Sequence, residues 1–270
     1  MSILLIYCIV GLLIGLLSGL LGIGGGLVAV PALSWIFMQQ NIDYALVMHM
    51  AVATSLATII FTSLASIRAF NRQGNVVWTL VKSLLPGVTL GTVVGIAISH
   101  FLSTHDLRTI FGLFVLIISF RMMFEKYHGP APTHKNMPAK KKKYWDPHAI
   151  ALTTGLSSGL LGVGGSIIII PYLLHEGFSM RQASGTSITC ALPIALIAVC
   201  STILASWKLP NLPAYSTGYV NWSAALGIAI PSIFSVDMGA WLGKRLPQTF
   251  LRKLFAVFLV FVSLEMLFYR

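Results

Sequence analysis

Charged residues are scarce in this sequence, and whole stretches contain none. Of the 270 residues, 56% are hydrophobic and only 9% are charged, whereas about 25% of the residues of soluble proteins are charged. No charged side chain occurs in 1–42, 44–67, 149–175 or 182–207. Each window exceeds the ~20 apolar residues that a helix needs to cross a bilayer. The composition therefore excludes an ordinary soluble domain and predicts an all-α integral membrane protein.

Cysteines and acidic residues are also few. Cys8, Cys190 and Cys200 lie in apolar segments without the spacing of a metal site, so we expect no disulfide framework, metal or cofactor. The net charge of +11 comes from 18 Lys and Arg against 7 Asp and Glu. These basic residues gather between the apolar windows, which is typical of loops on the cytoplasmic side of the cell membrane. They do not form the clustered basic face of a nucleic-acid-binding protein.

Glycine is plentiful, and its distribution reveals an internal repeat. The segment 15–26, GLLSGLLGIGGG, recurs at 155–166 as GLSSGLLGVGGS, and a proline follows each copy five residues later. Weaker echoes occur in the same order in both halves, as expected for a duplication. We therefore divide the chain into a first membrane repeat, 1–124, a basic cytoplasmic linker, 125–147, and a second membrane repeat, 148–270.

Each half is expected to hold one glycine-interrupted element and three long helices. The interrupted elements cover 3–39 and 149–175, and the helices are expected at 44–67, 77–99, 106–124, 182–207, 219–243 and 250–269. An interrupted element can be one broken helix that crosses the membrane once, or a re-entrant hairpin that enters and leaves on one side. Hairpins would make the two repeats inverted. They would also place more lysines and arginines on the side of the linker, so the positive-inside rule favours them.

The paired segments GIGGG and GVGGS, each with a proline five residues on, give the chain a family resemblance. It resembles the TauE/SafE family of sulfite and organosulfonate exporters over both halves. The resemblance implies a secondary carrier of small sulfur-containing or organic anions, such as sulfite or sulfoacetate. The motif itself does not indicate which anion is carried.

The glycine runs are the first candidate for an anion site. Irregular backbone within a membrane is tolerated only where protein or a water-filled cavity satisfies its N–H groups. A helix that starts after such a break directs partial positive charge at an anion. The candidate donors are the backbone N–H groups of Gly24, Gly25, Gly26, Gly164, Gly165 and Ser166. The alternative is that these glycines only allow helices to pack closely.

Two repeated hydroxyl pairs are the second candidate. Thr54 and Ser55 lie in the middle of a long helix, and Thr186 and Ser187 hold the matching place in the second half. Their hydroxyls can donate to an anion without placing a fixed charge in the membrane. Alternatively, each hydroxyl bonds to a carbonyl of its own helix.

Two titratable residues are candidates for binding a coupling proton. Asp237 is a carboxylate deep in an apolar segment, and an acid within a membrane is a functional candidate by default. His49, five residues before Thr54, can titrate near neutral pH. The alternatives are that Asp237 pairs with a nearby basic residue or caps a distorted helix turn, and that His49 has no part in transport.

These features together predict a transporter and not an enzyme. We expect it to work by alternating access, and the two titratable residues would allow coupling to protons. No nucleophile, metal cluster or paired acid and base is evident in the sequence, so no catalytic residue is assigned. A passive anion channel is the main alternative, and a membrane-embedded enzyme is a weaker one. The expected partners are a small anion, most simply sulfite or a sulfonate, and membrane lipids, with a homodimer left open.

Overall fold

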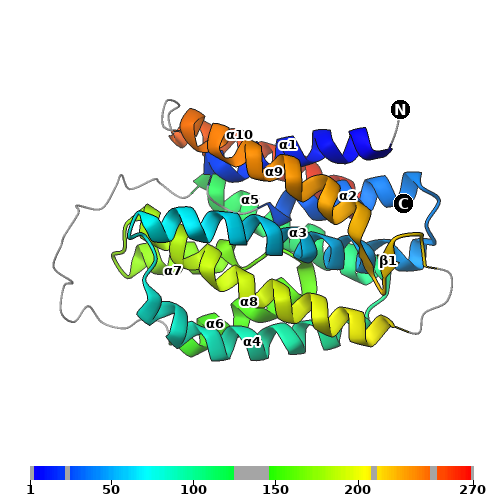
Figure 1. Ribbon diagram of the computed structural model, residues 1–270, viewed down its shortest axis with the longest axis horizontal. Coiled ribbons are helices and arrows are strands. Elements are labelled where there is room, and N and C mark those ends of the chain that lie inside the picture. Colours follow the sequence, from blue (N-terminus) through cyan, green and yellow to red (C-terminus); the bar gives the residue numbers. More distant parts are fainter. Residues whose placement is uncertain (1–2, 22–24, 125–145, 208–211, 244–247, 269–270) are drawn as a thin grey trace.

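The computed structural model describes residues 3–21, 25–124, 146–207, 212–243 and 248–268. These residues form ten α-helices and one pair of two-residue strands (Figure 1). The helices are α1 (Ile3–Leu21), α2 (Gly26–Gln39), α3 (Tyr44–Arg72), α4 (Trp78–Phe101), α5 (Thr104–Phe124), α6 (Pro147–Leu161), α7 (Ser166–His175), α8 (Met180–Ser206), α9 (Trp222–Gly243) and α10 (Gln248–Phe268). The antiparallel strands β1 (Ser216–Thr217) and β2 (Val220–Asn221) precede α9.

The all-helical prediction is confirmed, and five helices can cross a membrane by length and composition. They are α1, α3, α4, α8 and α9, with spans at Ile3–Leu20, Tyr44–Arg72, Trp78–Phe101, Met180–Ser206 and Trp222–Gly239. The predicted helix at 44–67 continues to Arg72, because no helix breaker occurs before Gly74, where φ is +68°. Residues 125–145 of the predicted linker lie outside the described residues.

One predicted helix begins later than expected. Residues 220–221 belong to a strand, and α9 starts at Trp222 rather than at residue 219. The side chain of Asn221 accepts a hydrogen bond from the backbone N–H of Ala224 at 3.0 Å, which satisfies an otherwise free donor in the first turn of α9. Gly218 has a φ of +57°, which a helix does not allow. The local turn and the cap together fix the helix start.

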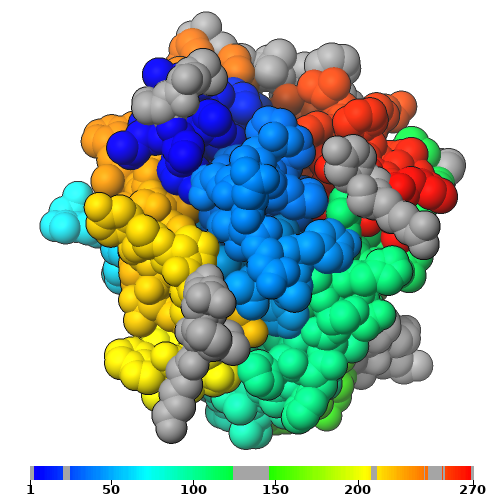
Figure 2. Space-filling view, turned by 90° about the vertical axis from the view of Figure 1, so that its right-hand side faces the viewer, coloured from blue at the N-terminus to red at the C-terminus, as the bar shows by residue number. Residues whose placement is uncertain are grey.

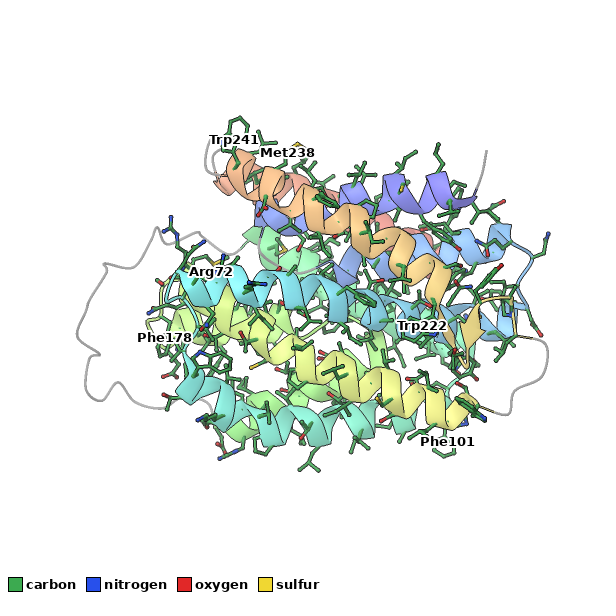
Figure 3. All side chains as sticks on the ribbon, in the orientation of Figure 1. Arg72, Phe101, Phe178, Trp222, Met238 and Trp241 are labelled. Atoms are coloured by element: carbon green, nitrogen blue, oxygen red, sulfur yellow. The ribbon has the colours of Figure 1, made fainter. Side chains whose placement is uncertain are left out.

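The long helices run between two ends of the molecule. We call the end with the starts of α1, α3 and α9 the terminal end, and the end with the starts of α4, α6 and α8 the linker end. Phe101 and Trp222 lie at the terminal end, and Arg72 and Phe178 lie at the linker end (Figure 3). Seen from the terminal end, the blue segment of α2 and early α3 lies at the centre, between yellow α8 and green α4 and α5 (Figure 2).

Each glycine-interrupted element is a hairpin, not one broken helix. The element α1–α2 starts and finishes at the terminal end, since α3 begins there five residues after α2 ends (Figure 1). The element α6–α7 starts and finishes at the linker end, where α8 begins. The two hairpins therefore enter the bundle from opposite ends.

Two helix pairs are packed closely enough to need glycine at the contact. A Cβ atom added to Gly91 of α4 would collide with the carbonyl oxygen of Leu152 on α6, and one added to Gly155 of α6 would collide with that of Val88 on α4. Between α1 and α9, a Cβ on Gly15 would likewise collide with the carbonyl oxygen of Ser232. Such small-residue contacts are typical of helix pairs within membranes. We call these two contacts the glycine seams.

The remaining helices complete the core. The helices α3 and α8 pack against each other, and α5 packs against α10. The side chains of Met50, Leu56 and Ile194 are fully buried on α3 and α8. The large apolar side chains exposed on the outside, such as Phe234, Phe261 and Leu204, fit a surface that faces lipid rather than water.

Candidate functional site

The start of α2, directly after the first glycine run, lies against the turn between α6 and α7. A Cβ atom added to Gly26 would lie 2.6 Å from the carbonyl oxygen of Gly162 and 2.8 Å from Cα of Val163. The backbones of the two glycine segments therefore touch. Ser55 fixes the contact, because its hydroxyl donates to the same Gly162 carbonyl at 3.0 Å. Two segments 136 residues apart (162 − 26) thus meet at one place.

The turn between α6 and α7 is irregular and buried. Gly162, Gly164 and Gly165 have φ values of +72°, +75° and +78°, in the left-handed region where glycine carries no steric penalty. All residues of the turn, 162–166, are buried. The surrounding helices therefore shield this irregular backbone, as is required at membrane depth.

The helices α2 and α7 start without a side-chain cap. Asp43, Asp146 and Ser179 cap α3, α6 and α8 by accepting hydrogen bonds from backbone N–H groups. In contrast, Gly25 and Gly165 precede α2 and α7, and neither offers a side-chain oxygen. The first N–H groups of a helix have no acceptor within it. Both helix starts can therefore donate to an external acceptor. Gly24 lies outside the described residues.

Thr54 and Thr186 hold matching structural positions. The backbone N–H of Asn221, directly before α9, donates to the Thr54 hydroxyl oxygen at 3.1 Å. The backbone N–H of Val77, directly before α4, donates to the Thr186 hydroxyl oxygen at 3.1 Å. Both threonines are fully buried. Each hydroxyl thus accepts from the backbone of the other half of the chain, which neither alternative drawn from the sequence anticipated.

Ser187 differs from its repeat mate Ser55. It is fully buried, and its hydroxyl has no hydrogen-bond partner in the described part of the chain. Ser166, at the first position of α7, is also buried. Of the predicted hydroxyl groups, Ser55 thus touches the glycine turn directly, whereas Ser166, predicted as a backbone N–H donor, belongs to the turn itself.

We expect Thr54→Val to destabilise the fold. Valine keeps the shape of threonine but cannot accept the hydrogen bond from Asn221, so a buried N–H group would lose its partner. Such a loss costs about 1–3 kcal/mol. The measurement is the thermal unfolding of the purified protein in detergent, with Thr62→Val as the control, because the Thr62 hydroxyl bonds only to carbonyls of its own helix. Equal melting temperatures for both variants would contradict the structural role of Thr54.

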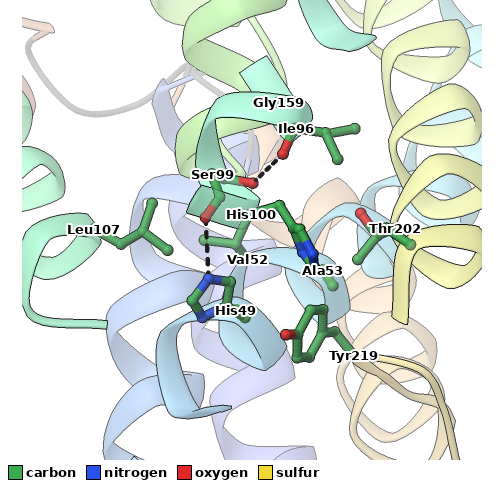
Figure 4. Close-up of a pocket in the computed structure, with 11 residues that line it drawn as sticks. His49, Val52, Ala53, Ile96, Ser99, His100, Leu107, Gly159, Thr202 and Tyr219 are labelled. Atoms are coloured by element: carbon green, nitrogen blue, oxygen red, sulfur yellow. Dashed lines mark hydrogen bonds between the residues drawn. The ribbon is translucent and has the colours of Figure 1, made fainter. Parts of the chain in front are cut away.

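A small cavity lies among α3, α4, α8 and the turn of the strand pair (Figure 4). Its volume is about 20 Å³, which is enough for one water molecule. It is lined by His49, Val52, Ala53, Ile96, Ser99, His100, Leu107, Gly159, Thr202, Ala205 and Tyr219. Val52 connects it to the turn, because a Cβ on Gly162 would lie 3.2 Å from Cα of Val52. An anion of several atoms requires this cavity to widen.

His49 is held in the cavity wall by two neighbours. Its Nε2 atom lies 3.1 Å from the carbonyl oxygen of Ser99, which can only accept, so Nε2 carries the hydrogen. Its ring stacks on Tyr219 with centroids 5.1 Å apart. Burial raises the pKa of the Tyr219 phenol, so this hydroxyl stays protonated at neutral pH. The Nδ1 atom of His49 is buried and has no partner among the described residues.

Asp237 lies elsewhere. It is exposed on α9, and it does not line the described cavity. Its neighbours Met238 and Trp241 point away from the bundle (Figure 3). The helix α9 is continuous from Trp222 to Gly243, so Asp237 caps no break in it. Of the two proton-binding candidates, His49 is therefore the one that lines the cavity.

Sequence reasoning missed the polar residues that complete the cavity. Tyr219, Ser99 and Thr202 come from the strand pair, from α4 and from α8. One signal for Tyr219 was present, since it directly follows Gly218, which matches Gly74 in the repeat. Nothing in the sequence indicated that it would stack on a histidine 170 residues away (219 − 49).

Comparisons with known proteins identify one matching family and several similar membrane transporter proteins. A family model described as "Sulfite exporter TauE/SafE" matches residues 7–266. The chain is 33% identical over 263 residues to a probable membrane transporter protein of Haemophilus influenzae, with 97% of each chain covered. It is 28% identical to a probable membrane transporter protein of Methanocaldococcus jannaschii, over 96% of this chain and 93% of that protein. A probable membrane transporter protein of Bacillus subtilis is 24% identical, with 97% of both covered. No solved structure matches this chain.

Proposed function

This chain belongs to the TauE/SafE sulfite exporter family, and we propose that it is a secondary transporter that exports sulfite or a small organosulfonate across the cell membrane. Membership makes it a multi-pass membrane transporter and not an enzyme. The observation that carries the proposal is the contact between the two glycine segments, each of which opens an uncapped helix.

The chemistry of this contact favours an anion. A helix start carries roughly half a positive charge, and irregular helix ends near the midplane are where secondary transporters bind anionic groups. Gly26 touches Val163, and Val163 precedes the start of α7 by three residues, so the two starts are no more than roughly 16 Å apart. The proposed ligands are the backbone N–H groups of Gly24–Gly26 and Gly164–Ser166, with the hydroxyls of the two Thr-Ser pairs in support.

Transport by alternating access fits a pair of inverted repeats, 1–124 and 148–270. The opposed hairpins, α1–α2 and α6–α7, support inverted topology, because each starts and finishes at one end of the bundle and the two ends are opposite. The glycine seams join α1 to α9 and α6 to α4, so each seam links a hairpin of one half to a helix of the other. Two stiff units that move relative to each other would open the small cavity to either side.

The described basic residues support a cytoplasmic linker end. Arg68, Arg72, Lys82, Arg121, Arg181 and Lys253 lie in the parts of their helices nearest the linker end. Arg108, near the start of α5, lies toward the terminal end, where its guanidinium donates to the backbone oxygen of Glu265. Following the positive-inside rule, we propose that the linker 125–147 lies in the cytoplasm.

The proposal is tested in proteoliposomes that contain the purified protein. We expect uptake of sulfite and sulfoacetate to saturate with concentration, and to be accelerated when unlabelled substrate is trapped inside. Flux that neither saturates nor responds to trapped substrate would instead indicate a passive channel. No flux of either anion would exclude the proposed substrates.

We further propose that His49 binds a coupling proton, and we expect His49→Gln to remove the pH dependence of transport. Protonation at the free Nδ1 would place a positive charge in the cavity wall, so uptake should rise as the pH falls from 8 to 5. Glutamine keeps a donor for the Ser99 carbonyl but does not titrate. The substrate is a simple alkanesulfonate, because its own charge is constant in this range.

His100 and Asp237 provide the controls for this experiment. His100 lines the same cavity but is exposed, whereas Asp237 lies outside it. His100→Gln and Asp237→Asn should both keep the pH dependence. If Asp237→Asn alone removes it, Asp237 is the coupling residue and the proposal for His49 is wrong.

A further inference from the structure

We propose that Ser158 is a ligand of the transported oxyanion, through its side-chain hydroxyl at the start of α7. This inference rests on the proposed function and adds a side chain to a site otherwise built from backbone. Ser158 lies in the last turn of α6 and was not among the candidate residues found from the sequence.

The Ser158 hydroxyl is buried without a partner. The residue is 0% exposed, and its Oγ atom makes no hydrogen bond within the described part of the chain. Other hydroxyls of the same helix are satisfied, since Thr154 donates to Ile150 at 2.6 Å and Ser157 donates to Thr154 at 3.1 Å. A buried polar group that stays unpaired is costly and calls for an explanation. A ligand that pairs with it only during transport is such an explanation.

The hydroxyl lies at the uncapped start of α7. Its Oγ is 3.4 Å from the place that a Cβ atom on Gly165 would occupy, and Gly165 precedes the first residue of α7. No side chain caps this helix, and Ser158 does not do so either, because its Oγ accepts no hydrogen bond from the first turn. An unused hydroxyl and unused N–H groups therefore lie side by side.

The chemistry of these groups restricts the ligand. Backbone N–H groups can only donate, and a serine hydroxyl can donate as well. A ligand that satisfies both must accept several hydrogen bonds from neighbouring directions, as the oxygens of sulfite or a sulfonate do. The methyl carbon Cγ2 of Thr154 and Cδ1 of Ile194 lie 2.7 and 3.1 Å from the same Cβ position. Of the three atoms nearest this position, the Ser158 hydroxyl oxygen is therefore the polar one.

The test compares Ser158→Ala with Ser157→Ala in the proteoliposome assay, with sulfite as the substrate. Loss of one hydrogen bond to an anion should raise the KM of Ser158→Ala roughly tenfold. Its melting temperature without substrate should stay the same or rise, because the deleted hydroxyl has no protein partner. Ser157→Ala loses only a bond within its own helix and should keep the KM of the wild type.

Three results would overturn the inference. The first is a KM for Ser158→Ala within twofold of the wild type while the wild type transports sulfite, in which case the proposed function stands without Ser158. The second is a lower melting temperature with an unchanged KM, which would assign the hydroxyl to the fold. The third is a wild type that moves neither sulfite nor sulfoacetate, which removes the proposed function and this inference together.

Discussion

Replacing Gly165 by leucine should abolish sulfite uptake. A side chain at this position would crowd the start of α7, where its Cβ alone would lie 2.7 Å from the Thr154 methyl carbon. It would block the approach of an anion to the N–H groups of the first turn. Initial uptake rates in proteoliposomes, normalised to the amount of folded protein, should fall to the level of empty vesicles.

Gly177→Leu is the matched control for Gly165→Leu. Gly177 also has a positive φ, +90°, so leucine there carries a similar backbone strain of about 1–2 kcal/mol. It follows the other end of α7, and a Cβ there would meet no atom within 4 Å. Uptake by Gly177→Leu should therefore be close to that of the wild type. Equal loss in both variants would mean that strain, and not blockage of the site, stops transport.

Replacing Gly155 by valine should destabilise the protein more than any other change considered. The added Cβ would already collide with the backbone of α4, at the carbonyl oxygen of Val88 and at the backbone nitrogen of Thr92. Backbone atoms cannot move aside as side chains can, so α4 and α6 would have to separate along the glycine seam. We expect the melting temperature in detergent to fall by roughly 5–10 °C, as for overpacking of several kcal/mol.

Gly112→Val, on α5, tests whether the seam is special. A Cβ there would first meet the side chain of Leu267 on α10, with Cγ at 2.9 Å, and a leucine side chain can change its rotamer. The melting temperature should therefore fall by much less than in Gly155→Val. If the two variants have the same melting temperature, then close backbone packing between α4 and α6 is not a special source of stability.

The long helices were predictable because their physical signal is local. Apolar windows such as 182–207 set the length of a span, and Ser179 with Gln182 forms the capping box that starts α8. The choice between a broken helix and a hairpin needed more than local pattern. The distribution of charge favoured hairpins, and both interrupted elements are hairpins in the structure.

The details of the site were less predictable, because they depend on contacts between distant residues. The sequence showed that Thr54 and Thr186 occur in repeated pairs, but not that each accepts from a backbone N–H group more than 100 residues away. Glycine has two uses here that look alike in sequence. Gly155 serves helix packing, whereas Gly164 and Gly165 adopt a left-handed backbone.

The sequence also did not show in which direction a titratable side chain faces. Asp237 and His49 both occur in apolar helices, where periodicity is weak because lipid and the protein interior are both apolar. The structure places Asp237 on an outer face and His49 in a cavity wall. The preference for His49 thus comes from the three-dimensional arrangement and not from composition.

The most direct test of the anion site is the thermal stability of the purified protein as sulfite is added. A ligand that binds the folded state stabilises it in proportion to the logarithm of its concentration once the site is filled. The melting temperature of the wild type and of Gly177→Leu should rise in this way, and that of Gly165→Leu should not. A wild type that responds to neither sulfite nor sulfoacetate, or a Gly165→Leu variant that responds fully, would contradict an anion site at the glycine turns.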